Sequence, residues 1–328
     1  MRDNSKQASF ADFLLGNRTK VTRTEKLLQR INEEVDFSFA HEVHNKLHKA
    51  KTGRRPYSAV LMYKIVLLQN LFGLSDAGAE EAIYDRKSFQ DFLGLNLNDN
   101  IPDESSIGRF RNALVEAKED ENFFQEVDKQ LEEKGIMVSK GKSVDATIIE
   151  VPKGRKKEDG TSTRDKDASF TKKNDRTYHG FKGNIATDTR GEFIKTCHTS
   201  TAKDHDSKHI DKLLDGKEEA VFGDSAYASQ ERKKEFRKEG KFYGMIDRAS
   251  RGHPLSSSQK KKNKKLSSIR CRVEHPFAEI KCRMNFKARY RGIRKNEWQF
   301  KMVCAVYNLK RVIGQIYPPQ RQAVAWIN

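Results

Sequence analysis

The chain has 328 residues, enough for two domains, and its 36% hydrophobic content with 19 phenylalanines excludes a chain that is disordered throughout. Its most apolar run, residues 57–73, is too short and too polar to cross a membrane, and its start lacks the apolar core of a signal peptide, so we expect a cytoplasmic protein. The net charge of +18 lies entirely within residues 230–311, where 25 basic and seven acidic side chains stand. This basic block predicts a polyanionic partner, most simply nucleic acid, although a merely solubilising surface has the same composition.

Residues 1–55 are polar and predict an arm that leads into the first domain, whereas residues 56–135 predict a set of short helices. We expect helices to start near Val60, Ser75, Ser88, Ser105 or Ser106, and Phe123, and the first of them to end at Gly73. Short helices joined by tight turns fit a DNA-binding helix-turn-helix and other helical bundles equally well.

From residue 136 the pattern changes to strands that alternate with helices, which indicates a mixed α/β sheet in a second domain that extends to residue 316. Strands are expected at 143–151, 178–189, 192–199, 219–222 and 242–246, and helices at 206–214, 229–238, around Glu274 and at 297–313. Polar composition predicts a mobile loop at 153–176, a basic loop at 250–268 and a tail at 317–328.

Three carboxylates lie at positions where a negative charge is expected to have a positively charged partner. Asp145 interrupts the most hydrophobic strand, Asp224 follows a short apolar strand, and Glu274 lies on a helix between Arg270 and Lys281. Such hard oxygen ligands suit Mg²⁺ or Mn²⁺, and two ions held by shared carboxylates could promote an in-line phosphoryl displacement. Each carboxylate taken alone fits a capped turn or a surface ion pair better, and spacing by itself does not overturn that reading.

The residues around Glu274 resemble the signature of bacterial insertion-sequence DDE transposases, in the group whose founding members include insertion sequence five. That signature is Tyr, two residues, Arg, three residues, Glu, six residues and Lys, and Arg270, Glu274 and Lys281 match it, while Ser267 stands in the Tyr position. Further landmarks of the family occur in family order at 101–111, 143–145, 178–182, 202–206, 223–227 and 290–296.

This resemblance implies a ribonuclease-H-like catalytic domain with a mixed sheet, preceded by an all-helical DNA-binding domain. It implies that Asp145, Asp224 and Glu274 are the catalytic residues and hold two Mg²⁺ ions, or Mn²⁺. The expected activity is a Mg-dependent transposase that binds the terminal inverted repeats of its element, cleaves double-stranded DNA and joins the freed 3′-hydroxyl to target DNA. The family also implies a homodimer on DNA at the bacterial nucleoid, with no membrane contact.

Two alternatives remain open at this point. One is a nuclease of the same fold that cuts DNA without joining it, and the other is a transposase-derived regulator that binds DNA but has lost its chemistry. The predicted DNA contacts are Arg270, Lys281, Lys182, Arg272, Lys260, Lys261, Lys262, Arg291, Arg294 and Lys295. Trp298 is expected to pack on a helix face rather than to stack on a base.

Overall fold

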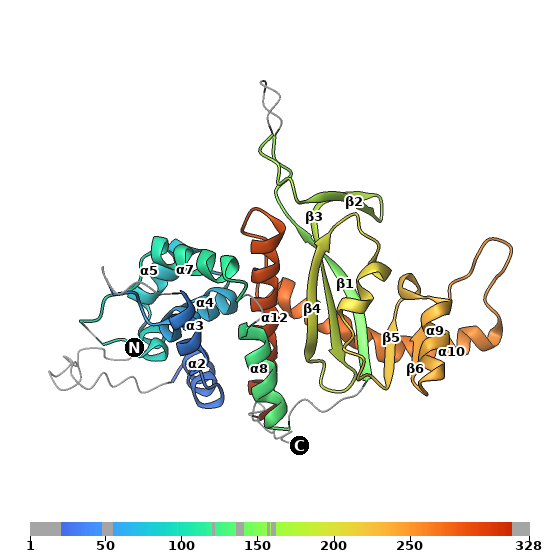
Figure 1. Ribbon diagram of the computed structural model, residues 1–328, viewed down its shortest axis with the longest axis horizontal. Helices are drawn as coiled ribbons and strands as arrows, with labels where there is room; N and C mark the ends of the chain where they lie inside the picture. The colour runs from blue at the N-terminus through green and yellow to red at the C-terminus, as the bar shows by residue number, and fades with distance from the viewer. Residues whose placement is uncertain are drawn as a thin grey trace, which may run out of the picture.

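The computed structural model of the protein describes residues 21–47, 55–96, 98–119, 122–135, 141–155, 158 and 162–316. A long helix, α12 (Ile293–Ile316), stands between a group of N-terminal helices and a six-stranded sheet (Figure 1). The predicted α/β class with an N-terminal helical region is therefore confirmed. No helix in the described parts of the chain has the length and apolar character needed to cross a membrane.

Seven helices are described in the N-terminal region. They are α2 (Arg23–Glu34), α3 (Ala40–Leu47), α4 (Ala59–Phe72), α5 (Asp76–Asp85), α6 (Lys87–Leu93), α7 (Glu104–Glu116) and α8 (Asn122–Glu133). Gly73 ends α4 in the left-handed conformation with a φ of 68°, and the Ser75 side chain caps α5, as predicted. The cap of α7 was predicted wrongly, because Asp103 and not Ser105 or Ser106 accepts the hydrogen bond from the first turn.

The arm expected over residues 1–55 contains two helices instead. Thr22 and Glu25 form a capping box that begins α2, and Leu28 and Ile31 on the inner face of that helix are buried. The polar composition concealed these helices because only a narrow stripe of each one is apolar. Residues 1–20 and 48–54 of the predicted arm lie outside the described residues.

The sheet is mixed. It contains β1 (Gly141–Glu150), β2 (Ser169–Lys173), β3 (Arg176–Asp188), β4 (Ile194–Thr201), β5 (Ala220–Gly223) and β6 (Phe242–Met245). β1 pairs with β3 and β3 with β4 in antiparallel register, whereas β5 and β6 run parallel to β1 on its other side. This order, with helices following β5 and β6, is consistent with the ribonuclease-H-like fold that was predicted.

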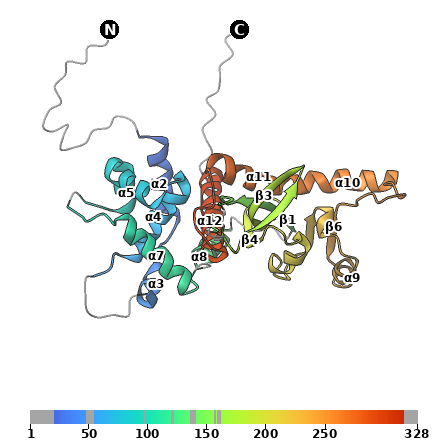
Figure 2. The same cartoon turned by 90° about the horizontal axis from the view of Figure 1, so that it is seen from above.

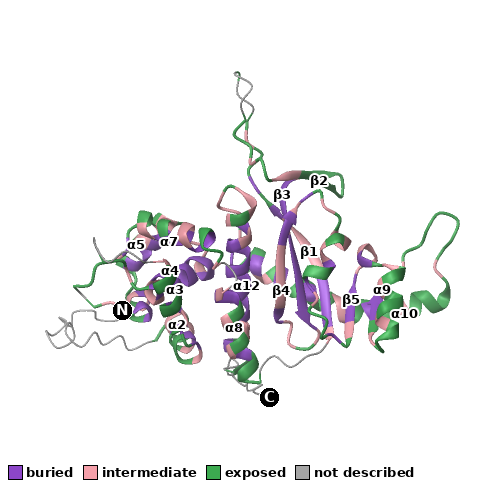
Figure 3. Ribbon diagram, in the orientation of Figure 1, coloured by how far each residue is buried: buried purple, intermediate pink, exposed green. Residues whose placement is uncertain are grey.

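Helix α12 unites the two regions. It is buried over most of its length, and its apolar side chains belong to one core that includes α4, α8 and one face of the sheet (Figure 3). Asn308 of α12 also bonds both backbone groups of Ile194, at 2.9 and 2.8 Å, and so holds the start of β4. Trp298 is buried in this core, as expected.

The remaining elements connect β4 to α12. They are η1 (Asp206–Lys212), η2 (Ser225–Tyr227), α9 (Gln230–Lys238), α10 (Ser257–Arg270), η3 (Cys271–Val273), α11 (Glu274–Ala278) and the π-helical turn η4 (Glu279–Arg283). The predicted basic loop at 250–268 was wrong over most of its length, since α10 occupies it. Ser256 and Gln259 form a capping box that starts this helix.

The predicted mobile loop at 153–176 is anchored where it is described. The Asp165 and Asp167 carboxylates accept hydrogen bonds from the backbone of Gly292 (2.8 Å) and Ile293 (3.0 Å) at the start of α12. Part of this segment also forms β2. The predicted helix at 206–214 is the 3₁₀ helix η1, and the predicted tail at 317–328 lies outside the described residues.

Candidate active site

The strand register brings the first two candidate carboxylates to one level of the sheet. β1 and β5 are parallel neighbours, with Ser143 of β1 opposite Phe222 of β5. If this register is continued by two residues, Asp224 lies opposite Asp145. Asp224 directly follows the last residue of β5. The end of a strand in an open α/β sheet is a common position for a ligand site.

Asp145 is largely enclosed, with 19% of its side chain exposed. Burial raises its pKa to about 6, and the nearby negative charges of Glu274 and Asp224 act in the same direction. A backbone hydrogen bond from Ala146 (2.9 Å) and the Arg270 guanidinium oppose that rise. Further positive charge close by would therefore favour the ionised form of Asp145.

Asp224 is held at the tip of β5 by its own backbone turn. Its carboxylate accepts a hydrogen bond of 2.6 Å from the Ser225 amide and caps the short helix η2. The preceding residue must be a glycine, because a Cβ on Gly223 would lie 2.8 Å from the Met245 sulfur and 2.9 Å from a Val144 methyl. This close packing around Gly223 fixes the position of Asp224 at the end of the strand.

Glu274 comes from a different part of the fold. Helix α10 ends at Arg270, and after one 3₁₀ turn Glu274 begins α11, with 58% of its side chain exposed. The Arg270 guanidinium lies 3.5 Å from an Asp145 oxygen and 3.3 Å from a Glu274 oxygen. Arg270 thus joins the first and third candidate carboxylates, which are 129 positions apart in the sequence.

The donor set fits a divalent cation in its chemistry. All three side chains offer hard oxygen atoms, and the enclosed Asp145 lies in a negative environment that a cation would relieve. In the described residues, no three acidic, histidine or cysteine side chains are gathered closely enough to coordinate a metal ion. The positive charge next to Asp145 and Glu274 in this structure belongs to Arg270.

Lys281, in the π-helical turn η4, contacts β1 three residues after Asp145. Its ammonium group donates to the Ile148 carbonyl of β1 at 2.8 Å. Desolvation lowers the pKa of Lys281, and the ammonium group of Lys173 on β2 lowers it further. Lys281 and Lys173 thus place two positive charges near the end of β1, and such a position is favourable for a phosphate group.

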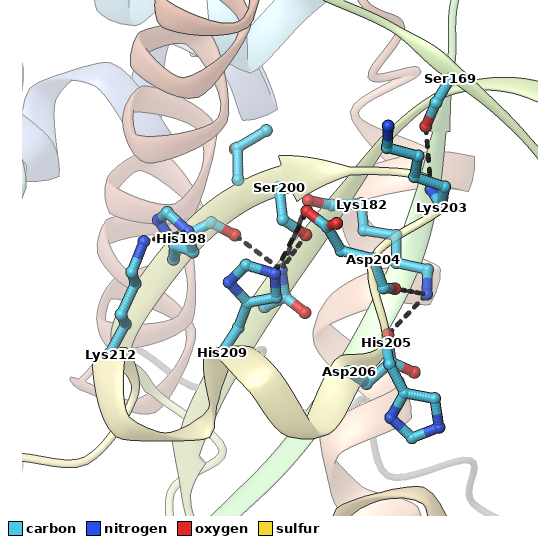
Figure 4. A network of polar contacts seen from close by, with 12 residues as sticks. Ser169, Lys182, His198, Ser200, Lys203, Asp204, His205, Asp206, His209 and Lys212 are labelled. Atoms are coloured by element: carbon cyan, nitrogen blue, oxygen red, sulfur yellow. Dashed lines mark hydrogen bonds and ion pairs between the residues drawn. The ribbon is translucent and has the colours of Figure 1, made fainter.

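Lys182 has partners on its own chain (Figure 4). Its ammonium group donates to the Asp204 carbonyl at 2.6 Å and to the Asp206 carboxylate at 2.8 Å. The structure therefore brings together the motifs at 178–182 and 202–206. Asp206 pairs with this lysine, while His205 is the cap of η1. A DNA contact by Lys182 stays a prediction.

The other predicted DNA contacts fall into two groups. Arg272, Arg291 and Arg294 donate to backbone carbonyls of Thr189 (2.9 Å), Thr163 (3.2 Å) and Val115 (2.7 Å), and Lys295 is half-buried at the start of α12. Lys260 and Lys261 are exposed on α10, whereas Lys262 pairs with Asp247 at 2.9 Å. Ser267, in the position of the family tyrosine, is exposed on the same helix.

One buried side chain near the site received no role from the sequence. Tyr227 is 1% exposed, and its hydroxyl makes no hydrogen bond with any described residue. Burial raises its pKa, as do the charges of Asp206, Asp145 and Asp224. Its place three residues after Asp224, in the motif at 223–227, was the available signal, but an aromatic residue there is equally suited to the core.

Two family models match the chain. The transposase DDE domain matches residues 139–309, and a transposase domain (DUF772) matches residues 17–113. The first match covers more than half of the chain and includes all three candidate carboxylates, whereas the second covers α2 to α6 and most of α7. No solved structure matches the chain. The finer likeness to the insertion-sequence-five group stays a prediction.

Proposed function

Because this chain belongs to the DDE transposase family, we propose that it binds the terminal inverted repeats of its own element, cleaves the DNA there and joins the freed 3′ ends to target DNA. One observation carries the proposal beyond the family. Asp145 and Glu274, from a central strand and a later helix, both contact the Arg270 guanidinium, and Asp224, at a strand end, lies close enough for its charge to act on Asp145. Surface ion pairs alone would not require three such separate elements to converge.

In this proposal Asp145, Asp224 and Glu274 hold two Mg²⁺ ions, for which Mn²⁺ can substitute. When bound, these ions supply positive charge to the attacking and leaving oxygens of an in-line displacement. Arg270 and Lys281 orient the phosphate that reacts, the first as a planar fork and the second as a point charge. Arg270 contacts Asp145 and Glu274, and Lys281 donates to the Ile148 carbonyl of β1, the strand that carries Asp145.

Cleavage and joining are two displacements at phosphorus. In the first, a water oxygen bonds to the phosphorus at the end of the element, the bond to the 3′ oxygen breaks, and that oxygen takes up a proton. In the second, the freed 3′-hydroxyl loses its proton and bonds to a phosphorus of the target strand, whose own 3′ oxygen leaves. The charge on the phosphate oxygens grows in both steps, which is why cations must line the site.

The helical region has a separate role in the proposal. Its helices recognise the terminal repeat, and two copies of the chain act on the two ends of one element, so the active form on DNA at the nucleoid is a homodimer. The family match over residues 17–113 and the confirmed helical architecture support this assignment.

The test uses purified protein, Mg²⁺ and a DNA fragment that carries both ends of the genomic segment encoding the chain. We expect metal-dependent 3′ ends that reappear joined to a second DNA. Asp145→Asn, Asp224→Asn and Glu274→Gln should each reduce cleavage by at least about 10³-fold, the scale on which a catalytic group is lost, and leave binding of the ends nearly unchanged.

Other results would select the alternatives. Cuts without joined products would favour the nuclease, and specific end binding without any cut in Mg²⁺ or Mn²⁺ would favour the DNA-binding regulator. Undiminished cleavage by any of the three variants would remove that residue from the site.

A further inference from the structure

Helix α10 carries an exposed row of lysines. Lys260, Lys261, Lys264 and Lys265 are all exposed, and none of them forms an ion pair within the described residues. The helix has no acidic residue. At about 100° per residue these four side chains lie on one half of the helix circumference, and they span about 7.5 Å along its axis. We call these four residues the lysine row.

The opposite half of α10 is attached to the catalytic domain. Leu266 is its buried residue and lies close to Gly244 of β6. Asn263 bonds both the amide (3.0 Å) and the carbonyl (2.8 Å) of Asp247, whose carboxylate also holds Lys262. The lysine row therefore faces away from the protein on a helix whose orientation is fixed.

The surroundings of the row are strongly basic. Residues 230–270 contain 14 lysines and arginines and four acidic residues. Helix α9, at the same end of the sheet, has no buried residue and carries five of these basic side chains. A surface with this excess of positive charge fits a polyanion, and a row of lysines without ion pairs among the described residues fits the phosphates of a nucleic acid backbone.

The position of α10 identifies which part of the DNA it meets. The helix ends at Arg270, which contacts Asp145 and Glu274. It extends from there away from α12, while the N-terminal helices lie on the other side of α12 (Figure 2). A duplex held by the N-terminal helices and passing the carboxylates would meet α10 only beyond the point of cleavage.

We propose that the lysine row binds the phosphate backbone of the flanking duplex, which is the DNA outside the element next to the cleavage point. This inference rests on the proposed function and adds to it a second DNA segment with its own binding surface. Because Arg270 belongs to the same helix, flanking DNA bound to the row would also fix the helix end that faces the scissile phosphate.

The test compares two DNA substrates for each protein. One carries the terminal repeat with about two helical turns of flanking duplex, and the other ends at the cleavage point. For the wild type, the flank should tighten binding and steepen the salt dependence of log Kd by about 0.9 for each phosphate contacted, hence by about 3 to 4 for the whole row. The variant K260Q/K261Q/K264Q/K265Q should lose most of both gains. Glutamine is a good helix former, so circular dichroism should be unchanged.

The matched control is K118Q/K129Q/K208Q/K217Q, which removes four exposed lysines outside α9 and α10. This variant should retain the full effect of the flank. The inference is overturned if the flank does not tighten DNA binding by the wild type, or if both variants lose this tightening equally. It is also overturned if the row variant binds the substrate without a flank as weakly, relative to the wild type, as it binds the substrate with one. A wild type that does not bind the repeat at all would instead contradict the proposed function.

Discussion

Arg270 places a positive charge between two of the three candidate metal ligands. Its guanidinium is 20% exposed, and one of its buried nitrogen atoms has no hydrogen-bond partner within the described residues. The same group is expected to bind a phosphate during the reaction. Its contacts with Asp145 and Glu274 therefore place an internal cation beside two of the carboxylates that we propose as metal ligands.

This leads to a prediction about metal and stability. Arg270→Ala should lower the free energy of unfolding in EDTA by about 1 to 3 kcal/mol, because Asp145 loses its nearest cation while it stays enclosed beside two other carboxylates. Added Mg²⁺ should stabilise this variant more than it stabilises the wild type. Thermal unfolding with and without Mg²⁺ measures both effects.

Arg272→Ala is the matched control, since this neighbouring arginine donates to the Thr189 carbonyl instead. It should respond to Mg²⁺ as the wild type does. Equal Mg²⁺ responses in Arg270→Ala and the wild type would show that Arg270 and the metal do not act on the same carboxylates.

The identity of the candidate residues could be read from the sequence, but their partners could not. Asp145 and Asp224 stand out because a carboxylate in or beside an apolar strand is costly, and Glu274 because it matches the family signature with Arg270 and Lys281. The pairing of Lys182 with Asp206 depends on how β3 lies against η1, and the two residues are 24 positions apart. No local pattern encodes such a contact, so Lys182 could only be predicted as a free cation.

Among the elements, the strands were predicted best and the polar helices worst. Strands β1, β3 and β5 are rich in β-branched or apolar residues that mark them locally. Helix α10 is almost entirely polar, and its capping box from Ser256 to Gln259 is the one sequence signal that indicates a helix there. Charge alone therefore suggested a loop, whereas the cap and one buried leucine are sufficient for a helix in the folded chain.

Helix α8 permits a prediction on pH. Asp128 of this helix lies 3.6 Å from the Lys195 ammonium group of β4, yet burial raises its pKa from 3.8 to about 6. A carboxyl whose pKa is raised by folding stabilises the fold below its unfolded pKa, and this contribution is lost as pH rises through 6. The free energy of unfolding of Asp128→Asn, relative to that of the wild type, should therefore rise by about 2 to 3 kcal/mol between pH 4 and pH 7.

Urea unfolding at several pH values measures this difference. Glu133→Gln, which removes an exposed carboxylate from the same helix, is the control for a change of net charge. A difference between Asp128→Asn and the wild type that stays constant across the pH range would contradict the assignment.

In the whole molecule, α12 makes one structural unit of the two regions. Its core includes residues of the N-terminal helices and of the sheet. A polar link reinforces it: Arg111 of α7 binds the Asp76 carboxylate of α5 at 2.7 and 2.8 Å and the Tyr290 hydroxyl at 3.0 Å. The Arg111 guanidinium also lies 4.1 Å from the centre of the Tyr290 ring, just before α12.

We therefore expect the helical region and the catalytic domain to unfold together. In a Trp326→Phe background, the fluorescence of the buried Trp298 reports on α12, while far-ultraviolet circular dichroism reports on all the helices. The two urea curves should coincide. Arg111→Ala should lower the stability by about 3 to 5 kcal/mol, because it leaves the half-buried Asp76 without its cation. Circular dichroism that is lost before the Trp298 signal in the parent protein would mean that the helical region and the catalytic domain unfold separately.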